Sequence, residues 1–139
     1  MKIAIISQNI RWKKFILENI DLPGYHADSL DFDIDINIVC SNGYDLIILD
    51  IEDVHKDNFY LLVFKMRMVF GWGPYFIVMS SDMSVGRNQL IDSIVSGSDD
   101  FIEKSDDVKT ILAKASSVKR RRYFETSNFE ERINYQVSV

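Results

Sequence analysis

The sequence lacks several features that would assign it to a well-defined class of protein. It has a single cysteine, Cys40, in 139 residues, so no disulfide can form within the chain. It has no apolar run of about 18 residues, so no membrane-spanning helix is expected. Residues 1–7 lack the apolar core and the cleavage site of a secretory signal. These absences together predict a cytoplasmic protein.

Positive charge is also scarce. The chain has 16 Lys and Arg against 21 Asp and Glu, which gives a formal net charge of −5. A general nucleic-acid-binding domain usually has a basic surface, so the folded body is not expected to bind nucleic acid. The two histidines, His26 and His55, have no cysteine or second histidine at ligand spacing, so no zinc site is predicted. The 47% hydrophobic content is typical of one globular domain with one core.

Short apolar runs alternate with helical repeats along the chain. Strands are predicted at residues 3–6, 44–50, 75–79 and 100–104, with a weaker strand pattern within 25–33. Helices are predicted at 10–20, 59–70, 84–96 and from 106 or 107 to about 122. Residues 34–38 alternate like a strand, although the topology favours a helix there. The order predicts an α/β fold, a doubly wound parallel sheet with helices on both faces.

The helical repeats also predict which residues face the core. In the first helix these are Trp12, Phe15, Ile16 and Ile20. In the last helix they are Val108, Ile111, Leu112, Ala115 and Val118.

Polar side chains follow the predicted strands at the ends where open α/β sheets bind ligands. In strand order these residues are Ser7 and Gln8, Asp50, Ser80 and Ser81, and Lys104. An aspartate can attack a phosphoryl donor, a lysine can pair with phosphate, and a hydroxyl can donate to a phosphoryl oxygen. The combination predicts a site that handles phosphate. The first strand is not followed by a glycine-rich phosphate loop, which disfavours a dinucleotide-binding fold.

Three blocks make residues 1 to about 122 resemble the response-regulator receiver domain. Residues 46–50, Leu-Ile-Ile-Leu-Asp, resemble the strand that carries the phosphoacceptor, and 57–59, Asp-Asn-Phe, resemble the Asp-Gly-aromatic that opens the third helix. Residues 97–104, Gly-Ser-Asp-Asp-Phe-Ile-Glu-Lys, resemble the fifth-strand signature. The resemblance implies a flavodoxin-like (βα)5 fold with strand order 2-1-3-4-5. It also implies that Asp50 is the phosphoacceptor, Ser80 (or Ser81) the switch hydroxyl, Phe101 the switch aromatic and Lys104 the phosphate-pairing lysine.

The chain departs from this family at the metal site. The acidic pair that binds Mg²⁺ in the family is replaced here by neutral Ser7 and Gln8. Because Mg²⁺ is held through carboxylates and water, Asp50 is expected to bind it weakly or not at all, unless Glu52 or Asp53 compensates. The resemblance therefore implies an atypical receiver that acts in signalling and is not an enzyme. The alternatives are a conventional receiver phosphorylated by a histidine kinase and, third, a flavodoxin-like enzyme that binds a small molecule.

The C-terminal part resembles winged-helix (OmpR/PhoB-type) response regulators. This implies transcription regulation and a homodimer through the fourth helix, the fifth strand and the fifth helix, with Asp100, Lys114 and Arg121 on that face. The basic run 119–122 has a second interpretation, since cations at a helix C-terminus complement its dipole. Residues 123–139 are predicted to be a linker, a tail or the start of a DNA-binding domain. DNA is expected to be bound only through a domain that this chain lacks.

Overall fold

The computed structural model describes residues 1–20, 22–31, 43–51, 59–80, 94–104 and 108–121. The chain divides into two compact units, Met1–Val108 and Lys109–Val139. The sheet and the helices Ile10–Asn19 and Phe59–Phe70 belong to the first unit. The predicted boundary after residue 122 stays a prediction, and everything predicted for 123–139 lies outside the described residues.

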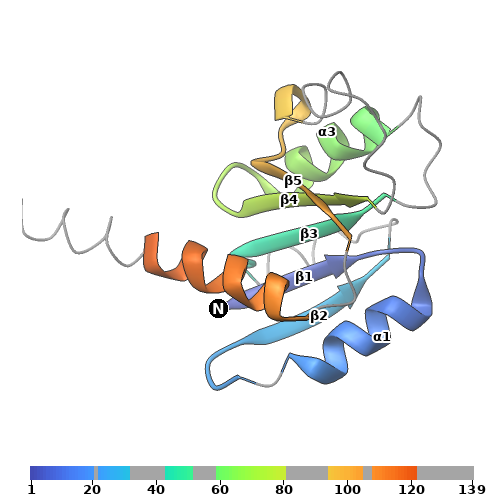
Figure 1. Ribbon diagram of the computed structural model, residues 1–139. Coiled ribbons are helices and arrows are strands. Elements are labelled where there is room, and N and C mark those ends of the chain that lie inside the picture. The colour runs from blue at the N-terminus through green and yellow to red at the C-terminus, as the bar shows by residue number, and fades with distance from the viewer. Residues whose placement is uncertain (21, 32–42, 52–58, 81–93, 105–107, 122–139) are drawn as a thin grey trace, which may run out of the picture. The chain divides into compact units, whose positions relative to one another are not determined.

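Five parallel strands form one sheet in the first unit (Figure 1). The strands are β1 (Lys2–Ile6), β2 (His26–Leu30), β3 (Leu46–Asp50), β4 (Tyr75–Ser80) and β5 (Asp100–Glu103). Their order, β2-β1-β3-β4-β5, confirms the predicted flavodoxin-like topology. The weak strand pattern within 25–33 does form β2, whereas the ambiguous stretch 34–38 lies outside the described residues.

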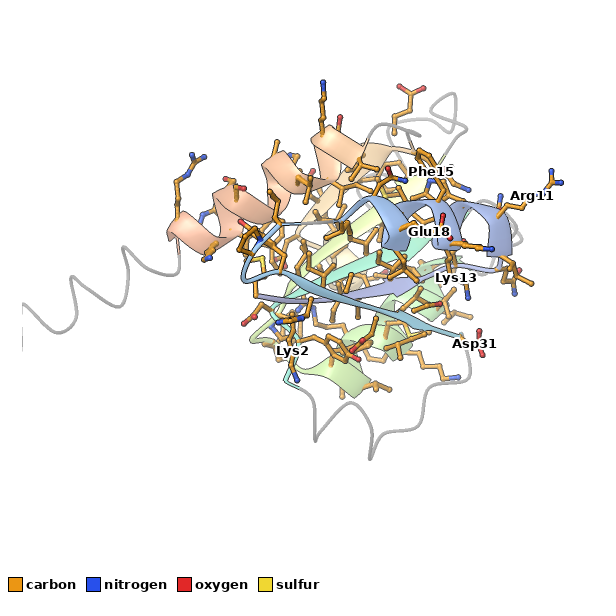
Figure 2. All side chains as sticks on the ribbon, turned by 90° about the horizontal axis from the view of Figure 1, so that it is seen from below. Lys2, Arg11, Lys13, Phe15, Glu18 and Asp31 are labelled. Carbon is orange, nitrogen blue, oxygen red and sulfur yellow. The ribbon has the colours of Figure 1, made fainter. Side chains whose placement is uncertain are left out.

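Helices cover both faces of this sheet. Helix α1 (Ile10–Asn19) lies on one face and α3 (Phe59–Phe70) on the other (Figure 2). Because both faces are covered, all five residues of β3 are buried, as the unbroken apolar run from Leu46 predicts. Among the described residues, no helix is both long and apolar enough to cross a membrane.

The helix that covers residues 108–121 is partly in each unit. Four of its five predicted core residues are buried, and the fifth, Leu112, is half-buried. The buried ones are Val108, Ile111, Ala115 and Val118. Spacings of three and four residues place them on one stripe of the helix, as the sequence predicts.

The predicted buried face of α1 needs correction. Phe15 is 43% exposed, and the residues that α1 buries are Trp12, Lys13 and Ile16. Lys13 completes the buried face beside Trp12 and Ile16, because its long stem can pack against apolar neighbours while its ammonium reaches Asp31, 3.4 Å away (Figure 2). In the predicted helix 84–96, only 94–96 are described. They are helical, but Ile94 and Val95 are 49% and 80% exposed.

A buried arginine connects α3 to the amino ends of β4 and β5, at the edge of the sheet opposite Asp50. The Arg67 side chain is 2% exposed. Its guanidinium donates to the carbonyl oxygens of Gly97 (2.6 Å), Pro74 (2.8 Å) and Gly71 (3.1 Å) and pairs with Asp99 Oδ2 at 2.8 Å. A Cβ at Gly97 would lie 2.9 Å from Arg67 Cγ, and the φ of Gly97 is +127°. The glycine and the first aspartate of the 97–104 block therefore have a structural role in this chain.

Candidate functional site

The parallel strands bring the predicted site residues to one edge of the sheet. Ser7 directly follows β1, Asp50 ends β3, Ser80 ends β4 and Lys104 directly follows β5. The register aligns these ends, because Asp50 pairs with Met79 and Ser80 pairs with Glu103. The carboxyl ends of neighbouring strands therefore place a carboxylate, two hydroxyls and an ammonium at one edge, as the sequence predicts.

Asp50 is at the centre of this arrangement. It is only 2% exposed, and two donors meet at its Oδ2 atom. The Ser7 hydroxyl donates to Oδ2 at 2.6 Å, and the Lys104 ammonium lies 2.9 Å from the same oxygen. Both partners are buried too, since Ser7 is 1% exposed and the Lys104 side chain 7%. A buried carboxylate requires such partners, because removing an unpaired charge from water is very unfavourable.

Ser7 takes part in two hydrogen bonds at once. Its hydroxyl donates to Asp50, and its oxygen accepts the backbone N–H of Asn9 at 3.0 Å. Asn9 is the N-cap of α1, and its side-chain oxygen accepts the Trp12 backbone N–H at 3.0 Å. The Ser7 hydroxyl is therefore a fixed part of the start of α1.

Lys104 contacts an aromatic ring as well as Asp50. Its Nζ lies 4.8 Å from the ring centroid of Trp12, which is 5% exposed. Its backbone N–H extends the pairing of β5 with β4 by donating to the Ser80 carbonyl at 2.8 Å. Lys104 thus has both its backbone and its charged group fixed at the same edge of the sheet.

The remaining predicted site residues differ in exposure. Ser80 is 6% exposed at the end of β4, and Ser81, the alternative switch hydroxyl, lies outside the described residues. Phe101 is 9% exposed and belongs to the core cluster, opposite Val78, so its side chain points inward. Gln8 is exposed. The roles that the resemblance implies for these residues stay predictions.

The predicted dimer residues fall in different parts of the chain. Asp100 begins β5 and is half-buried, and its Oδ1 accepts the Phe101 N–H at 2.9 Å. Lys114 is half-buried and Arg121 is exposed, both within the helical segment 108–121. Asp100 belongs to the first unit and the other two to the second, so their assignment to one face stays a prediction.

The donor set at Asp50 does not fit a divalent cation well. Asp50 and Lys104 balance each other in charge, and Ser7 is neutral. Within the described part of the chain, no three His, Cys, Asp or Glu side chains are close enough together to hold a metal ion. The Ser7 oxygen is already engaged by Asn9. A Mg²⁺ ion, which usually binds through carboxylates and water, would meet one carboxylate and a nearby ammonium. Glu52 and Asp53 lie outside the described residues.

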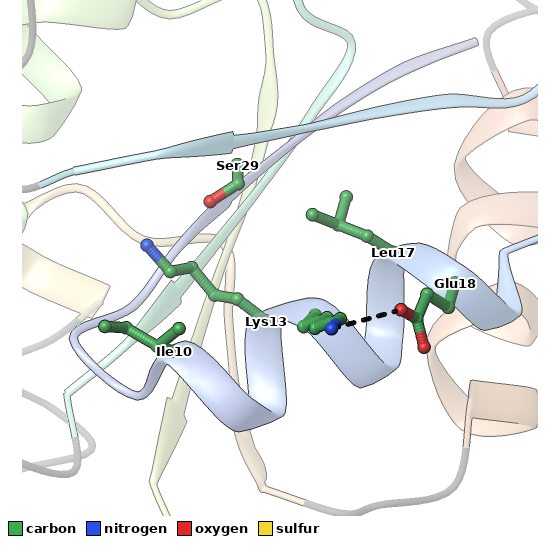
Figure 3. A pocket seen from close by; sticks show the side chains of 6 residues that line it. Ile10, Lys13, Leu17, Glu18 and Ser29 are labelled. Carbon is green, nitrogen blue, oxygen red and sulfur yellow. Dashed lines mark ion pairs between the residues drawn. The ribbon is translucent and has the colours of Figure 1, made fainter.

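A shallow groove of about 360 Å³ lies elsewhere, between α1 and β2 (Figure 3). Its lining residues are Ile10, Lys13, Lys14, Leu17, Glu18 and Ser29. The charges that line it are paired, since Lys13 lies 3.4 Å from Asp31 and Lys14 lies 3.9 Å from Glu18. None of the residues around Asp50 lines it. We therefore take the buried edge at Asp50, rather than this groove, as the candidate functional site.

Sequence reasoning missed Trp12 as part of this site and assigned it to a core or interface. Spacing within α1 does predict that Trp12 is buried, which is correct, but it cannot show which charge lies over the ring. Lys104 is 92 residues further along the chain. The contact depends on how the end of β5 meets the start of α1, and no local pattern encodes that.

Comparisons with known proteins agree with the fold. No family model matches the sequence, and no curated protein matches it either. A two-component response regulator from Clostridium difficile matches with a TM-score of 0.65 and 26% identity, covering 88% of this chain and 98% of that one. A Francisella response regulator receiver domain matches with a TM-score of 0.69 and 19% identity, covering 87% and 98%.

A third similar structure is a response regulator from Burkholderia pseudomallei with a phosphorylated aspartic acid and a calcium ion. It has a TM-score of 0.64 and 16% identity, and the match covers 89% of this chain and 74% of that one. These similarities show that the chain has the receiver-domain fold and that its structural neighbours are response regulators. They leave the chemistry of Asp50 to be argued from its own surroundings.

Proposed function

We propose that this chain is an atypical receiver domain: a signalling module, not an enzyme, whose phosphoacceptor-like Asp50 has weak or absent Mg²⁺-dependent phosphorylation. The main support is the pair of donors at Asp50 Oδ2, Ser7 at 2.6 Å and Lys104 at 2.9 Å. They satisfy the carboxylate within the protein and provide a positive charge that a bound cation would otherwise supply. The site retains an acceptor, a hydroxyl and an ammonium but has no second carboxylate among the described residues.

The charge of the site supports weak metal binding. An ammonium and a divalent ion that share one carboxylate repel each other. At about 4 Å and an effective dielectric constant of about 20, each pair of unit charges contributes about 4 kcal/mol of repulsion. A family-type site offsets this repulsion with extra carboxylates, and here Ser7 supplies a neutral hydroxyl instead. Mg²⁺ should therefore bind too weakly to assist phosphoryl transfer.

A conventional receiver, phosphorylated at Asp50 by a histidine kinase, is the second candidate. It is supported by the retained Asp50 and Lys104 and by the Burkholderia neighbour, whose structure has a phosphorylated aspartic acid. Glu52 and Asp53 would have to supply the missing metal ligands. A flavodoxin-like enzyme that binds a small molecule is favoured less, because the first strand is followed by Ser7-Gln8-Asn9 and not by a glycine-rich loop.

The experiment that separates these functions adds Mg²⁺ and beryllofluoride, or a small phosphodonor, to the protein and to Asp50→Asn. We expect no saturable change in tryptophan fluorescence, no change in sedimentation and no phosphoaspartate in either protein. A saturable Mg²⁺-dependent response in the wild type that is absent from Asp50→Asn would support the conventional receiver and exclude the atypical one.

The wider signalling role is also a proposal. By resemblance, we propose that the chain regulates transcription from the cytoplasm as a homodimer whose contact face includes Asp100, Lys114 and Arg121. Contact with DNA would come through a separate DNA-binding domain. The basic residues late in the helical segment 108–121, which match the resembled subfamily, support this assignment.

A further inference from the structure

The Lys104 ammonium is held from two sides. Asp50 Oδ2 lies 2.9 Å from Nζ, and the ring centroid of Trp12 lies 4.8 Å from the same atom. A cation within about 6 Å of an indole face is attracted by the negative face of the ring, most strongly where water is excluded. Water is largely excluded here, because Trp12 is 5% exposed and the Lys104 side chain 7%.

These contacts belong to a closed cycle of interactions that passes through the start of α1. The Ser7 hydroxyl donates to Asp50, and Ser7 Oγ accepts the Asn9 N–H. The Asn9 side chain accepts the backbone N–H of Trp12, and the Trp12 indole faces Lys104, which pairs with Asp50. This cycle of interactions thus joins the end of β3, the residue after β5 and the first turn of α1.

We propose that Trp12 is a positioning residue: its indole face fixes the Lys104 ammonium at Asp50 and couples the charge of Asp50 to the first turn of α1. The reason is geometric. A lysine has a flexible four-carbon stem and a compact charge, so one carboxylate fixes the distance of the ammonium but not its direction. The ring of Trp12 supplies the second constraint.

This inference goes beyond the proposed function, since it concerns the resting arrangement and holds whether or not Asp50 is ever phosphorylated. If Asp50 loses its charge, the buried ammonium loses its ion pair at Oδ2 and keeps its contact with the indole. Lys104 then moves relative to Trp12, and the N-cap contacts of Asn9 change with it. A residue that only fills space in the core would transmit no such change.

The chain contains a matched reference for this contact. Trp72 forms the second tryptophan–cation pair, with the guanidinium carbon of Arg67 5.1 Å from its ring centroid. Trp72 is 75% exposed, and Arg67 is fixed at the strand ends opposite Asp50. A change confined to the Asp50 site should therefore alter the signals of Trp12 and leave those of Trp72 unchanged.

The first test is nuclear magnetic resonance of the full chain. Ring current from the indole should shift the Lys104 ε-methylene protons upfield in the wild type. The shift should be smaller but present in Trp12→Phe and lost in Trp12→Leu. Asp50→Asn should move the Trp12 amide and indole signals and leave the Trp72 indole signal in place. An ordinary Lys104 shift in the wild type, an unchanged shift in Trp12→Leu, or an unmoved Trp12 in Asp50→Asn would overturn the proposal.

A double-mutant cycle gives a second, independent measurement. Trp12→Leu and Lys104→Met, made singly and together, should show a coupling that changes the unfolding equilibrium constant by about 2- to 30-fold, the range of a cation–π contact. Additive effects would contradict a direct contact. If Trp12→Leu does not fold, Trp12→Phe and the wild-type and Asp50→Asn spectra still decide the question. Mg²⁺ or phosphodonor responses do not enter either readout, so failure here is distinct from failure of the proposed function.

Discussion

Ser7→Asp tests most directly the proposal that Asp50 binds Mg²⁺ weakly because position 7 holds a neutral hydroxyl. Ser7 Oγ lies 2.6 Å from Asp50 Oδ2, and both residues are almost fully buried. An ionised carboxylate at position 7 cannot donate a hydrogen bond, so this contact is lost. The charge of the group formed by Ser7, Asp50 and Lys104 changes from zero to −1. A divalent cation then gains a second carboxylate ligand.

The expected cost follows from the structure. Two carboxylate charges about 4 Å apart repel by about 4 kcal/mol at an effective dielectric constant of about 20. The hydrogen bond lost to a charged group contributes about 1.5–3 kcal/mol. Attraction from Lys104, 2.9 Å from Asp50, offsets part of this sum. We expect the free energy of unfolding to fall by about 3 kcal/mol without metal, or about 12 °C in melting temperature at about 4 °C per kcal/mol.

Divalent metal should reverse most of this loss in the variant. Binding to the folded state stabilises it by about 2.7 kcal/mol when free Mg²⁺ reaches about 100 times its dissociation constant. The assay is thermal unfolding, followed by circular dichroism with and without Mg²⁺. Ser7→Asn is the matched control, since it has the shape of aspartate but no charge.

We expect Ser7→Asp to gain about 10 °C in saturating Mg²⁺, as the linkage above implies, while the wild type and Ser7→Asn gain nothing. If the wild type gains as much as Ser7→Asp, the neutral hydroxyl does not determine metal binding. If Mg²⁺ does not raise the melting temperature of Ser7→Asp, a factor other than the charge of the site limits metal binding. Either result would refute the reasoning.

Two further predictions concern stability and assembly. Arg67→Met should lower the free energy of unfolding in urea by about 3 kcal/mol or more, because it leaves the carbonyls of Gly97 and Pro74 and the Asp99 carboxylate without their buried donor. A loss below about 1 kcal/mol, the size of one ordinary hydrogen bond, would show that water replaces those contacts. Lys114→Glu should weaken self-association in sedimentation equilibrium, and a profile identical to that of a dimeric wild type would remove Lys114 from the contact face.

The elements and the residues at the strand ends could be predicted from the sequence because they depend on local patterns. The apolar run from Leu46 can be satisfied only by burial on both faces, so β3 and the place of Asp50 at its end follow directly. Alternation of strands and helices then predicts a parallel sheet, and the resemblance to the receiver family added the strand order that the structure has. Lys104 lies at the same edge of the sheet as Asp50 because their strands are parallel.

Local sequence patterns predicted burial wrongly where a side chain can be either buried or exposed. Phe15 has helical spacing with Trp12 and Ile16, yet it is 43% exposed, because the face of α1 that contacts the sheet is rotated toward Lys13. Hydrophobic periodicity fixes the direction of a buried stripe only approximately, and a long lysine stem can form part of it. The ammonium of Lys13 still reaches the exposed Asp31, 3.4 Å away, so burying the stem leaves its charge paired at the surface.

The sequence alone determined that a carboxylate, hydroxyls and an ammonium end neighbouring strands, and that neutral Ser7 and Gln8 follow the first of them. Only the tertiary structure decided how these groups meet: Ser7 and Lys104 both at Asp50 Oδ2, with the Trp12 ring over the ammonium. The physical reason is the range of the interactions. Strand and helix patterns depend on neighbours within a few residues, whereas Ser7 and Asp50 are 43 residues apart and meet only because β1 and β3 are paired in register.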